Sequence, residues 1–153
     1  MGHRPHDHAS PKAFFSADHR ECDTLWTKVE NAIDAKDEAQ IRATWAAFDT
    51  AMRRHFSMEE QVLFPAVENA MGMPPGGGPT AVMRGEHDQM RGVLDAMNHA
   101  LESGKVGDVL DHGDTLLILV QQHNVKEESV LYPMCDEALG VNWTKLADTL
   151  DRY

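Results

Sequence analysis

Six ionisable residues of this chain recur at matched positions and carry side chains that bind transition metals. The histidines are His19, His55, His87 and His123, at spacings of 36, 32 and 36 residues. Glu59 and Glu127 each come four residues after the second histidine of a pair. Imidazole nitrogens combined with carboxylate oxygens are typical donors to iron, manganese or zinc. A metal site of this kind requires a fold that brings these distant positions together.

The six residues belong to an internal repeat with an offset of 68 residues. The segments HFSMEEQVLFPAVENAMG (55–72) and HNVKEESVLYPMCDEALG (123–140) are identical at eight positions. The same offset, without a gap, aligns His19 with His87. We therefore predict two copies of one structural unit, at about 14–72 and 82–140, joined by the linker 71–79.

Each unit has the sequence pattern of a helical hairpin. Apolar and ionisable residues alternate in steps of three and four, the spacing of one helix face. This pattern continues past each glutamate, through Val62 and Ala66 in the first unit and Val130 and Met134 in the second. Two such hairpins predict an all-α protein, an antiparallel up-down-up-down four-helix bundle.

Local signals support the expected helix boundaries. Ser10 followed by Pro11 is typical of an N-cap and a first-turn proline, and Asp37 has capping-box spacing to Gln40. Gly72, Gly104 and Gly140 are expected at helix C-termini.

Further elements are expected at the two ends of the chain and inside the second helix of each unit. A short C-terminal helix is expected from Asn142 to near Arg152. Residues 1–13 are predicted to form an N-terminal arm, and residues 14–153 the bundle. Pro65 and Pro133 lie inside helical patterns at equivalent positions, where a proline is expected to kink or break a helix.

The hairpin geometry predicts that the six residues share one layer of the bundle. His19 precedes the expected turn at Lys36 by 17 residues, and His55 follows it by 19, so the two lie at nearly the same height. The second hairpin repeats this arrangement around Gly104. Buried ionisable groups are costly without a common partner. A pair of metal ions is our preferred partner, and a purely structural polar layer is the alternative.

Donor counting favours a dinuclear site. Four neutral imidazoles and two carboxylates provide two histidines per metal and leave both glutamates free to bridge. Iron suits this set, and manganese or zinc would also fit. With a bridging oxygen, each metal would have about five ligands and one open position, where oxygen, nitric oxide or peroxide could bind.

The pattern His … His-x-x-x-Glu, present twice and followed by EEQVLFP and EESVLYP, resembles the hemerythrin-like (HHE cation-binding) domain family. The resemblance extends over about 14–140. It implies a four-helix bundle with an oxo- or hydroxo-bridged centre of two iron ions. It further implies that His19 and His55 hold one iron, that His87 and His123 hold the other, and that Glu59 and Glu127 bridge them.

The chain departs from the oxygen-carrying members of that family at two places. They have a fifth histidine one turn after the third-helix ligand, and here that position is Arg91. They also have an aspartate five residues after the last histidine, where this chain offers Glu127 at four residues and Glu128 at five. Glu127 is preferred because Glu59 is its repeat mate. Glu60 and Glu128 are expected to hydrogen-bond ligand histidines, to face solvent, or to replace their neighbours as ligands.

For several further residues, an ordinary packing or surface position is the alternative to a functional role. Cys22 and Met90 are repeat mates one turn from His19 and His87, so they could line a sulfur-rich pocket, and packing is the alternative. His99 and His112 are expected on the surface. His3, His6 and His8 are assigned to a flexible arm, and Tyr132 has no assigned role.

Composition excludes several classes of protein. The chain has 153 residues, two cysteines and a formal charge of −11, which argues against a disulfide scaffold and against nucleic-acid or anionic-membrane partners. It has neither an apolar run of membrane-spanning length nor an apolar secretory signal, so a cytoplasmic location is expected.

The expected function is therefore a non-haem di-iron protein that binds O2, NO or peroxide. The alternatives are a di-iron enzyme that decomposes peroxide, an iron-donating repair protein, or an iron store or buffer. The sequence leaves the oligomeric state open.

Overall fold

The computed structural model describes residues 8–74 and 77–153, and within these ranges it is all helical, with no strand. The predicted fold class is confirmed. The helices are α1 (Pro11–Asp34), α2 (Glu38–Met58), η1 (Glu59–Leu63), α3 (Phe64–Ala70), α4 (Pro79–Glu102), α5 (Val106–Lys126), η2 (Glu127–Leu131), α6 (Tyr132–Leu139) and α7 (Trp143–Leu150). In the described ranges, no helix is long and apolar enough to cross a membrane.

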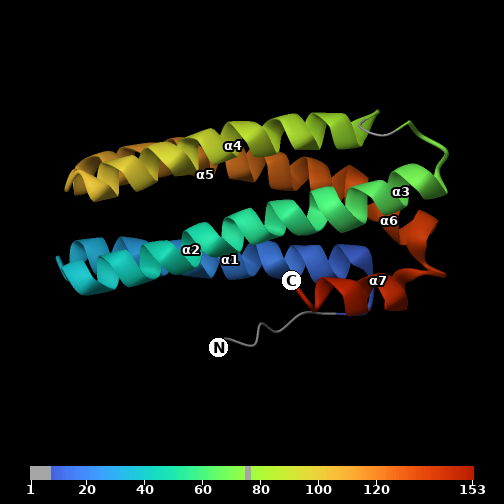
Figure 1. Cartoon of the computed structure of the whole chain (residues 1–153), viewed down its shortest axis with the longest axis horizontal. Helices are drawn as coiled ribbons and strands as arrows, with labels where there is room; N and C mark the ends of the chain where they lie inside the picture. The colour runs from blue at the N-terminus through green and yellow to red at the C-terminus, as the bar shows by residue number, and fades with distance from the viewer. Residues whose placement is uncertain (1–7, 75–76) are drawn as a thin grey trace.

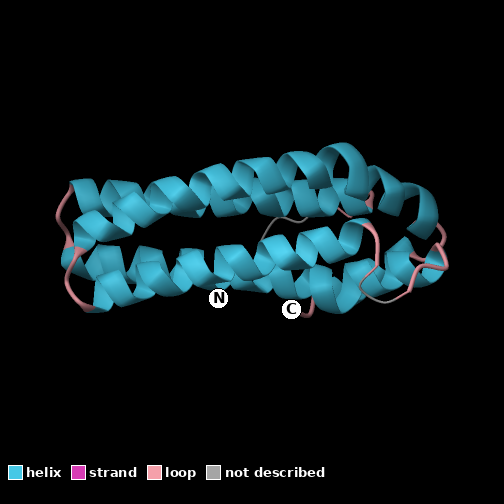
Figure 2. Ribbon diagram, turned by 90° about the horizontal axis from the view of Figure 1, so that it is seen from above, coloured by secondary structure: helices cyan, strands magenta, loops and turns pink. Residues whose placement is uncertain are grey.

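The long helices lie along one axis and form the bundle (Figures 1 and 2). Helix α1 packs on α2 and α4 packs on α5, as the two predicted hairpins require. The hairpins meet where α2 contacts α4 and where α1 contacts α5. Helix α7 lies against the end of the bundle near the start of α1 (Figure 1). The repeat in the sequence is therefore a repeat in space.

Most predicted boundary signals act as expected. The Ser10 hydroxyl accepts a hydrogen bond from the Ala13 N–H (3.0 Å), and the Asp37 carboxylate accepts one from the Gln40 N–H (3.2 Å). Lys36 and its repeat mate Gly104 both adopt left-handed backbone, with φ of 56° and 74°, and turn the chain between the helices of each hairpin.

The predictions for the C-terminal end hold in position, with local differences. Gly140 directly follows α6, as expected, and has an ordinary helical φ of −50°. Asn142 occupies the N-cap position of the expected short last helix, although its side chain makes no capping hydrogen bond, and that helix ends at Leu150, two residues before Arg152.

Pro65 and Pro133 do not break their helices, since helical residues continue without a gap from α2 through η1 to α3 and from α5 through η2 to α6. A π-helical turn precedes each of them, in which the Phe64 N–H bonds to the Glu59 carbonyl and the Tyr132 N–H bonds to the Glu127 carbonyl. Pro65 has no N–H to offer, and the Glu60 carbonyl instead accepts a hydrogen bond from Arg84 (3.2 Å).

The π turns overturn the predicted pattern of inward residues beyond the glutamates. A π turn inserts one extra residue, so the buried face moves forward by one position. Val130 is 55% exposed, whereas Leu131 and Tyr132 are buried; in the first unit Leu63 and Phe64 are buried in the same way. The prediction that Val130 faces inward is therefore wrong, because the expected period of 3.6 residues does not hold through η1 and η2. Val62, Ala66 and Met134 are half-buried, and Val62 and Ala66 pack against the edge of the core.

The apolar core consists of two clusters on either side of the candidate site. One lies towards the hairpin turns and is centred on Trp26, Phe48 and Leu94. The other lies towards the opposite end, includes Phe15, Phe64 and Tyr132, and also receives α7. The polar layer between them is thereby shielded from water along the bundle axis.

Candidate metal centre

All six predicted ligand residues lie in one buried layer at the middle of the bundle. Glu59, Glu127 and His87 are fully buried, and the remaining histidines are at most 5% exposed. His19 comes from α1, His55 from α2, His87 from α4 and His123 from α5. Glu59 is the first residue of η1 and Glu127 is the first residue of η2, so both π turns begin at the site.

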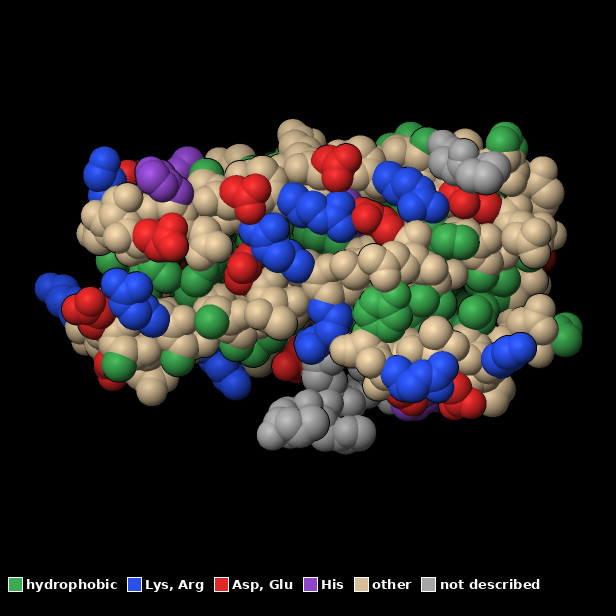
Figure 3. Space-filling view, in the orientation of Figure 1, with side chains coloured by type: hydrophobic (Ala, Val, Ile, Leu, Met, Phe, Trp, Pro, Cys, Tyr) green, Lys and Arg blue, Asp and Glu red, His purple; other side chains and the backbone are tan. Residues whose placement is uncertain are grey.

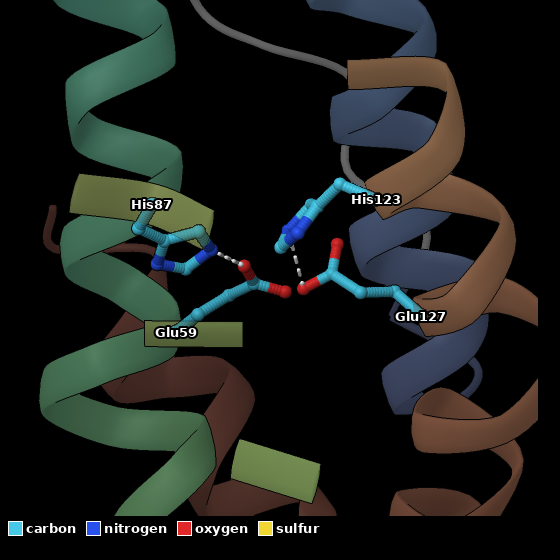
Figure 4. A group of neighbouring side chains, drawn as sticks. All are labelled: Glu59, His87, His123 and Glu127. Carbon is cyan, nitrogen blue, oxygen red and sulfur yellow. Dashed lines mark ion pairs between the residues drawn. The ribbon is translucent and has the colours of Figure 1, made fainter. Parts of the chain in front are cut away.

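The side chains form two groups of converging ligand atoms. One group contains Glu59, His87, His123 and Glu127, and the other contains His19, His55 and Glu127. Within each group the ligand atoms all lie within 4.8 Å of one another. Figure 4 shows the first group, with the two carboxylates facing each other between the two imidazoles.

Both glutamates reach both histidine pairs. An Oε1 atom of Glu59 lies 3.0 Å from Nε2 of His87 and 3.4 Å from Nε2 of His55. Oxygens of Glu127 lie 3.2 Å from Nε2 of His123 and 3.1 Å from Nε2 of His19. Glu127 thus presents one oxygen to each histidine pair, as a bridging carboxylate would, whereas Glu59 presents the same Oε1 to both pairs.

The outer nitrogen of each of the four site histidines donates to a carboxylate. The four Nδ1–H groups bond as follows: His19 to Glu128 (2.7 Å), His55 to Asp18 (2.7 Å), His87 to Glu60 (2.6 Å) and His123 to Glu86 (2.7 Å). A proton held on Nδ1 leaves the Nε2 lone pair directed at the centre, the arrangement of a metal-binding histidine. Glu60 and Glu128 thus act on histidines, as one of the sequence-based interpretations held.

Asp18 and Glu86 are missed by the sequence analysis. They are repeat mates, and each immediately precedes a site histidine, so the duplicated acid–His pair was a readable signal. Asp18 is 1% exposed, which is unusual for a carboxylate and is explained by its bond to His55.

Tyr132 also belongs to the site, although the sequence analysis gives it no role. Its hydroxyl donates towards Glu59 Oε2 (2.6 Å) and Glu127 Oε1 (2.9 Å), and lies 3.1 Å from His19 Nε2. Its repeat mate Phe64 has no hydroxyl, and its ring instead stacks near His87 at 5.8 Å. The extra residue in η2 turns Tyr132 inward, and a regular helical pattern could not predict that.

The donor set fits metal ions because several of its buried nitrogen and oxygen atoms have no hydrogen-bond partner among the described residues. Among the described residues, Oε1 of Glu59, Oε2 of Glu127 and the Nε2 atoms of His87 and His123 are buried without a hydrogen-bond partner. Such atoms are rare in proteins because leaving them unsatisfied is costly. All four point into the same small volume, which a cation would satisfy.

The charges around this volume shift the pKa values of the histidines and glutamates that surround it. Burial by itself lowers the pKa of His55, but the charge of Glu59 and the bond to Asp18 outweigh it, and the pKa lies well above 6.5. Burial raises the pKa of Glu59, but His55 and His87 outweigh it and hold that pKa well below 4.5. Protons on the imidazoles therefore balance the carboxylates when no metal is bound, and metal binding must displace them.

Arg91, which occupies the position of the missing fifth histidine, does not point into the site. Its guanidinium forms two bonds of 2.9 Å to Glu60, the carboxylate that holds His87. Burial by itself raises the pKa of Glu60, but the hydrogen bonds to His87 and Arg91 outweigh it and lower that pKa to about 2. Arg91 thus fixes a supporting carboxylate instead of donating to a metal.

The remaining candidate residues fall outside the ligand group. His99 is exposed and His112 is half-buried. His8 bonds to Asp151 at 2.9 Å, so this part of the predicted arm rests on the bundle; His3 and His6 lie outside the described residues. Cys22 and Met90 are buried in the apolar cluster and also line a cavity of about 30 Å³ beside the site.

Taken together, the fold and the site define a helical-bundle protein with a buried His/Glu cluster able to hold metal. A family model, the hemerythrin HHE cation binding domain, matches residues 10–135. The chain belongs to this family of cation-binding domains. Comparison with curated proteins and with solved structures finds no match.

Proposed function

We propose that this protein holds a non-haem centre of two iron ions, bridged by Glu59, Glu127 and an oxo or hydroxo group, and binds O2, NO or peroxide. His19 and His55 would hold one ion, and His87 and His123 the other. The observation that carries the proposal is that both glutamates reach both histidine pairs. Bridging carboxylates with nitrogen donors suit iron, and manganese or zinc remain alternative loadings.

The proposal assigns distinct tasks to the surrounding side chains. Asp18, Glu60, Glu86 and Glu128 keep the imidazoles oriented and hold a proton on each Nδ1, so that Nε2 is the nitrogen left to bind a metal in the neutral ring. The Tyr132 hydroxyl holds one oxygen of each bridging carboxylate. When bound, the two ions would supply an open coordination position and reversible electron transfer to a small ligand.

The size of the cavity beside the site supports a small ligand. It is lined by His19, His55 and His123 together with apolar side chains such as Met52 and Phe56. A volume of about 30 Å³ exceeds what one water needs, which is about 10–15 Å³ on the same measure, and suits a molecule of two heavy atoms. Larger substrates would require the helices to separate.

The alternatives make different kinetic predictions. A peroxide-decomposing enzyme would show steady-state turnover of hydrogen peroxide, whereas a binding protein would react once per centre. An iron store, buffer or iron-donating repair protein would release iron readily to a strong chelator. Deep burial of all six ligand residues favours slow release. We therefore propose a small diatomic molecule or peroxide as the ligand, a cytoplasmic location, and no nucleic-acid or membrane partner.

The test is metal analysis of the full chain purified without chelators, together with an ultraviolet–visible spectrum in air. We expect about two irons per chain, the number that two histidine pairs can hold, and charge-transfer absorption from a bridging oxygen to iron. A single zinc, or no metal in a folded protein, would contradict the di-iron proposal. Titration with nitric oxide and with peroxide then distinguishes binding from turnover.

A further inference from the structure

The two halves of the molecule are repeats, but they do not present equivalent faces to solvent beside the site. Helices α2 and α4 form one face, and α1 and α5 form the other. A shift of 68 residues takes each residue of α1 to its mate on α4, and each residue of α2 to its mate on α5. Differences between residues 68 positions apart therefore show how the chemical properties of the two faces differ.

Ion pairs and a large aromatic ring close the α2/α4 face. Arg53 on α2 bonds to Asp49 (2.8 Å) and reaches across to Asp95 on α4 (2.7 Å). Phe56 is buried and stacks on His87 with ring centroids 4.4 Å apart. Arg91 lies over Phe56 at 5.3 Å while binding Glu60. Figure 3 shows this face, with acidic and basic side chains interleaved over the middle of the bundle.

None of these closing residues has an equivalent on the α1/α5 face. The mates of Arg53, Asp49 and Phe56 are Gln121, Leu117 and Asn124, and the mate of Arg91 is Asp23. The cross-face ion pairs therefore cannot form there. Among the described residues, Glu128, the mate of Glu60, forms no salt bridge to an arginine, and its side chain is 40% exposed against 21% for Glu60.

A groove of about 570 Å³ lies on this second face, and it leads towards the site. Its lining includes His19 and Glu128. The inner cavity of about 30 Å³ is also lined by His19. One layer of side chains separates the outer groove from the inner cavity, because six residues line both: His19, Asp23 and Trp26 from α1, and Leu117, Val120 and Asn124 from α5.

We propose that small neutral ligands reach the metal site through the α1/α5 face, past a gate formed by Leu117, Val120 and Asn124, and not through the α2/α4 face. This inference rests on the proposed function for the identity of the ligand. The gate needs only side-chain rotation, because Leu117 is 38% exposed and has solvent into which it can turn. Its apolar members favour molecules such as O2 or NO over anions.

The kinetic test compares variants of the gate with a variant of the closed face in the iron-loaded full chain. Leu117→Trp should slow NO association about tenfold, equivalent to about 1.4 kcal/mol in activation free energy, and Leu117→Ala should accelerate it. Dissociation should change by the same factor, leaving Kd unchanged, because a gate alters the barrier and not the end states. Arg53→Ala, which opens the ion pairs of the other face, should leave both rates unchanged.

A second measurement does not depend on iron chemistry. In the zinc-loaded full chain, which is diamagnetic, dissolved O2 should broaden the methyl NMR signals of Leu116, which lines the inner cavity and is 2% exposed, more than those of the equally buried Leu94. Rates altered by Arg53→Ala but not by the Leu117 variants would overturn the route while the proposed function stands. Greater oxygen-induced broadening at Leu116 without NO binding to the iron-loaded protein would uphold the route and contradict the function.

Discussion

At the scale of single residues, the site works through paired contacts on both nitrogens of each imidazole. One nitrogen is held by a carboxylate and the other faces the centre, so each histidine has a fixed orientation before metal arrives. Preorientation lowers the entropic cost of binding. Removing a ligand and removing its support should therefore have separable effects.

Replacing a ligand histidine should change metal content. His87→Ala removes a donor from one histidine pair, and we expect loss of at least one metal per chain by elemental analysis, with circular dichroism confirming that the variant folds. His99→Ala is the control, because His99 is exposed and distant from the layer. Full metal content in folded His87→Ala would show that the ligand set is wrong.

Replacing a supporting carboxylate should weaken metal binding without abolishing it. Asp18→Asn keeps the shape of the side chain but weakens the bond to His55, and metal affinity should fall about 10–100-fold. Competition with a chromophoric chelator measures this change. Asp34→Asn, an exposed position on the same helix, should show wild-type affinity.

The phenol at the site should contribute to stability through its hydroxyl. Tyr132→Phe deletes the donor to two buried carboxylates, which should lower the free energy of unfolding by about 1–3 kcal/mol in urea. Tyr153→Phe removes an exposed hydroxyl that bonds to Gln61, and its effect should stay within about 0.5 kcal/mol. Equal effects of the two substitutions would contradict the buried-donor argument.

At the scale of helices, complementary sizes at repeat positions fit the two hairpins together. Gly113 on α5 leaves room for the ring of Trp26 on α1, where a Cβ atom would come within 2.5 Å of the ring. At the mate positions the sizes are exchanged, with Trp45 on α2 and Leu94 on α4. The large side chain thus comes from α1 (Trp26) on the α1/α5 face and from α2 (Trp45) on the α2/α4 face.

This complementarity predicts a coupled pair of substitutions. Gly113→Ala should destabilise the protein by about 1–3 kcal/mol in thermal or urea unfolding, because an aromatic ring cannot yield as a flexible chain would. Adding Trp26→Leu should recover part of that loss, in a non-additive way. Gly92→Ala, where an added Cβ meets nothing within 4 Å, should instead stabilise helix α4 by about 0.5–1 kcal/mol.

At the scale of the whole molecule, protons and metal compete for one buried cluster. Without metal, the raised pKa of His55 contributes stability below pH 6.5, and this is lost as the pH rises through the folded value. The lowered pKa of Glu59 contributes stability above pH 4.5, and this is lost as the pH falls through its folded value. The contribution of the cluster to metal-free stability should therefore be greatest between pH 4.5 and 6.5.

In the metal-loaded protein, protonation of the histidines should weaken metal binding instead of adding stability. Its histidines must be neutral, so metal should be lost as the pH falls through the range in which they protonate. Thermal unfolding of metal-free and loaded protein across pH, together with metal retention after dialysis, measures both effects. Unchanged metal content well below about pH 5 would exclude histidine as the main ligand type.

The sequence predicted the bundle and the six clustered residues because both follow from local spacing. Steps of three and four residues define helix faces, and the 68-residue offset requires two equivalent hairpins. Equal arm lengths about Lys36 and Gly104 then bring the histidines to one height. These relations hold whatever the neighbouring helices do, and the sequence alone therefore determined the fold class and the location of the candidate site.

Only the tertiary structure decided the inward residues beyond the glutamates and the difference between the two faces. The π turns move the buried face by one position and carry Tyr132 to the carboxylates of Glu59 and Glu127, which no regular period predicts. The roles of Asp18 and Glu86 likewise depend on which helix each one faces. The contrast between an ion-paired face and an open groove arises from contacts across helices far apart in the chain, which only the packed bundle brings together.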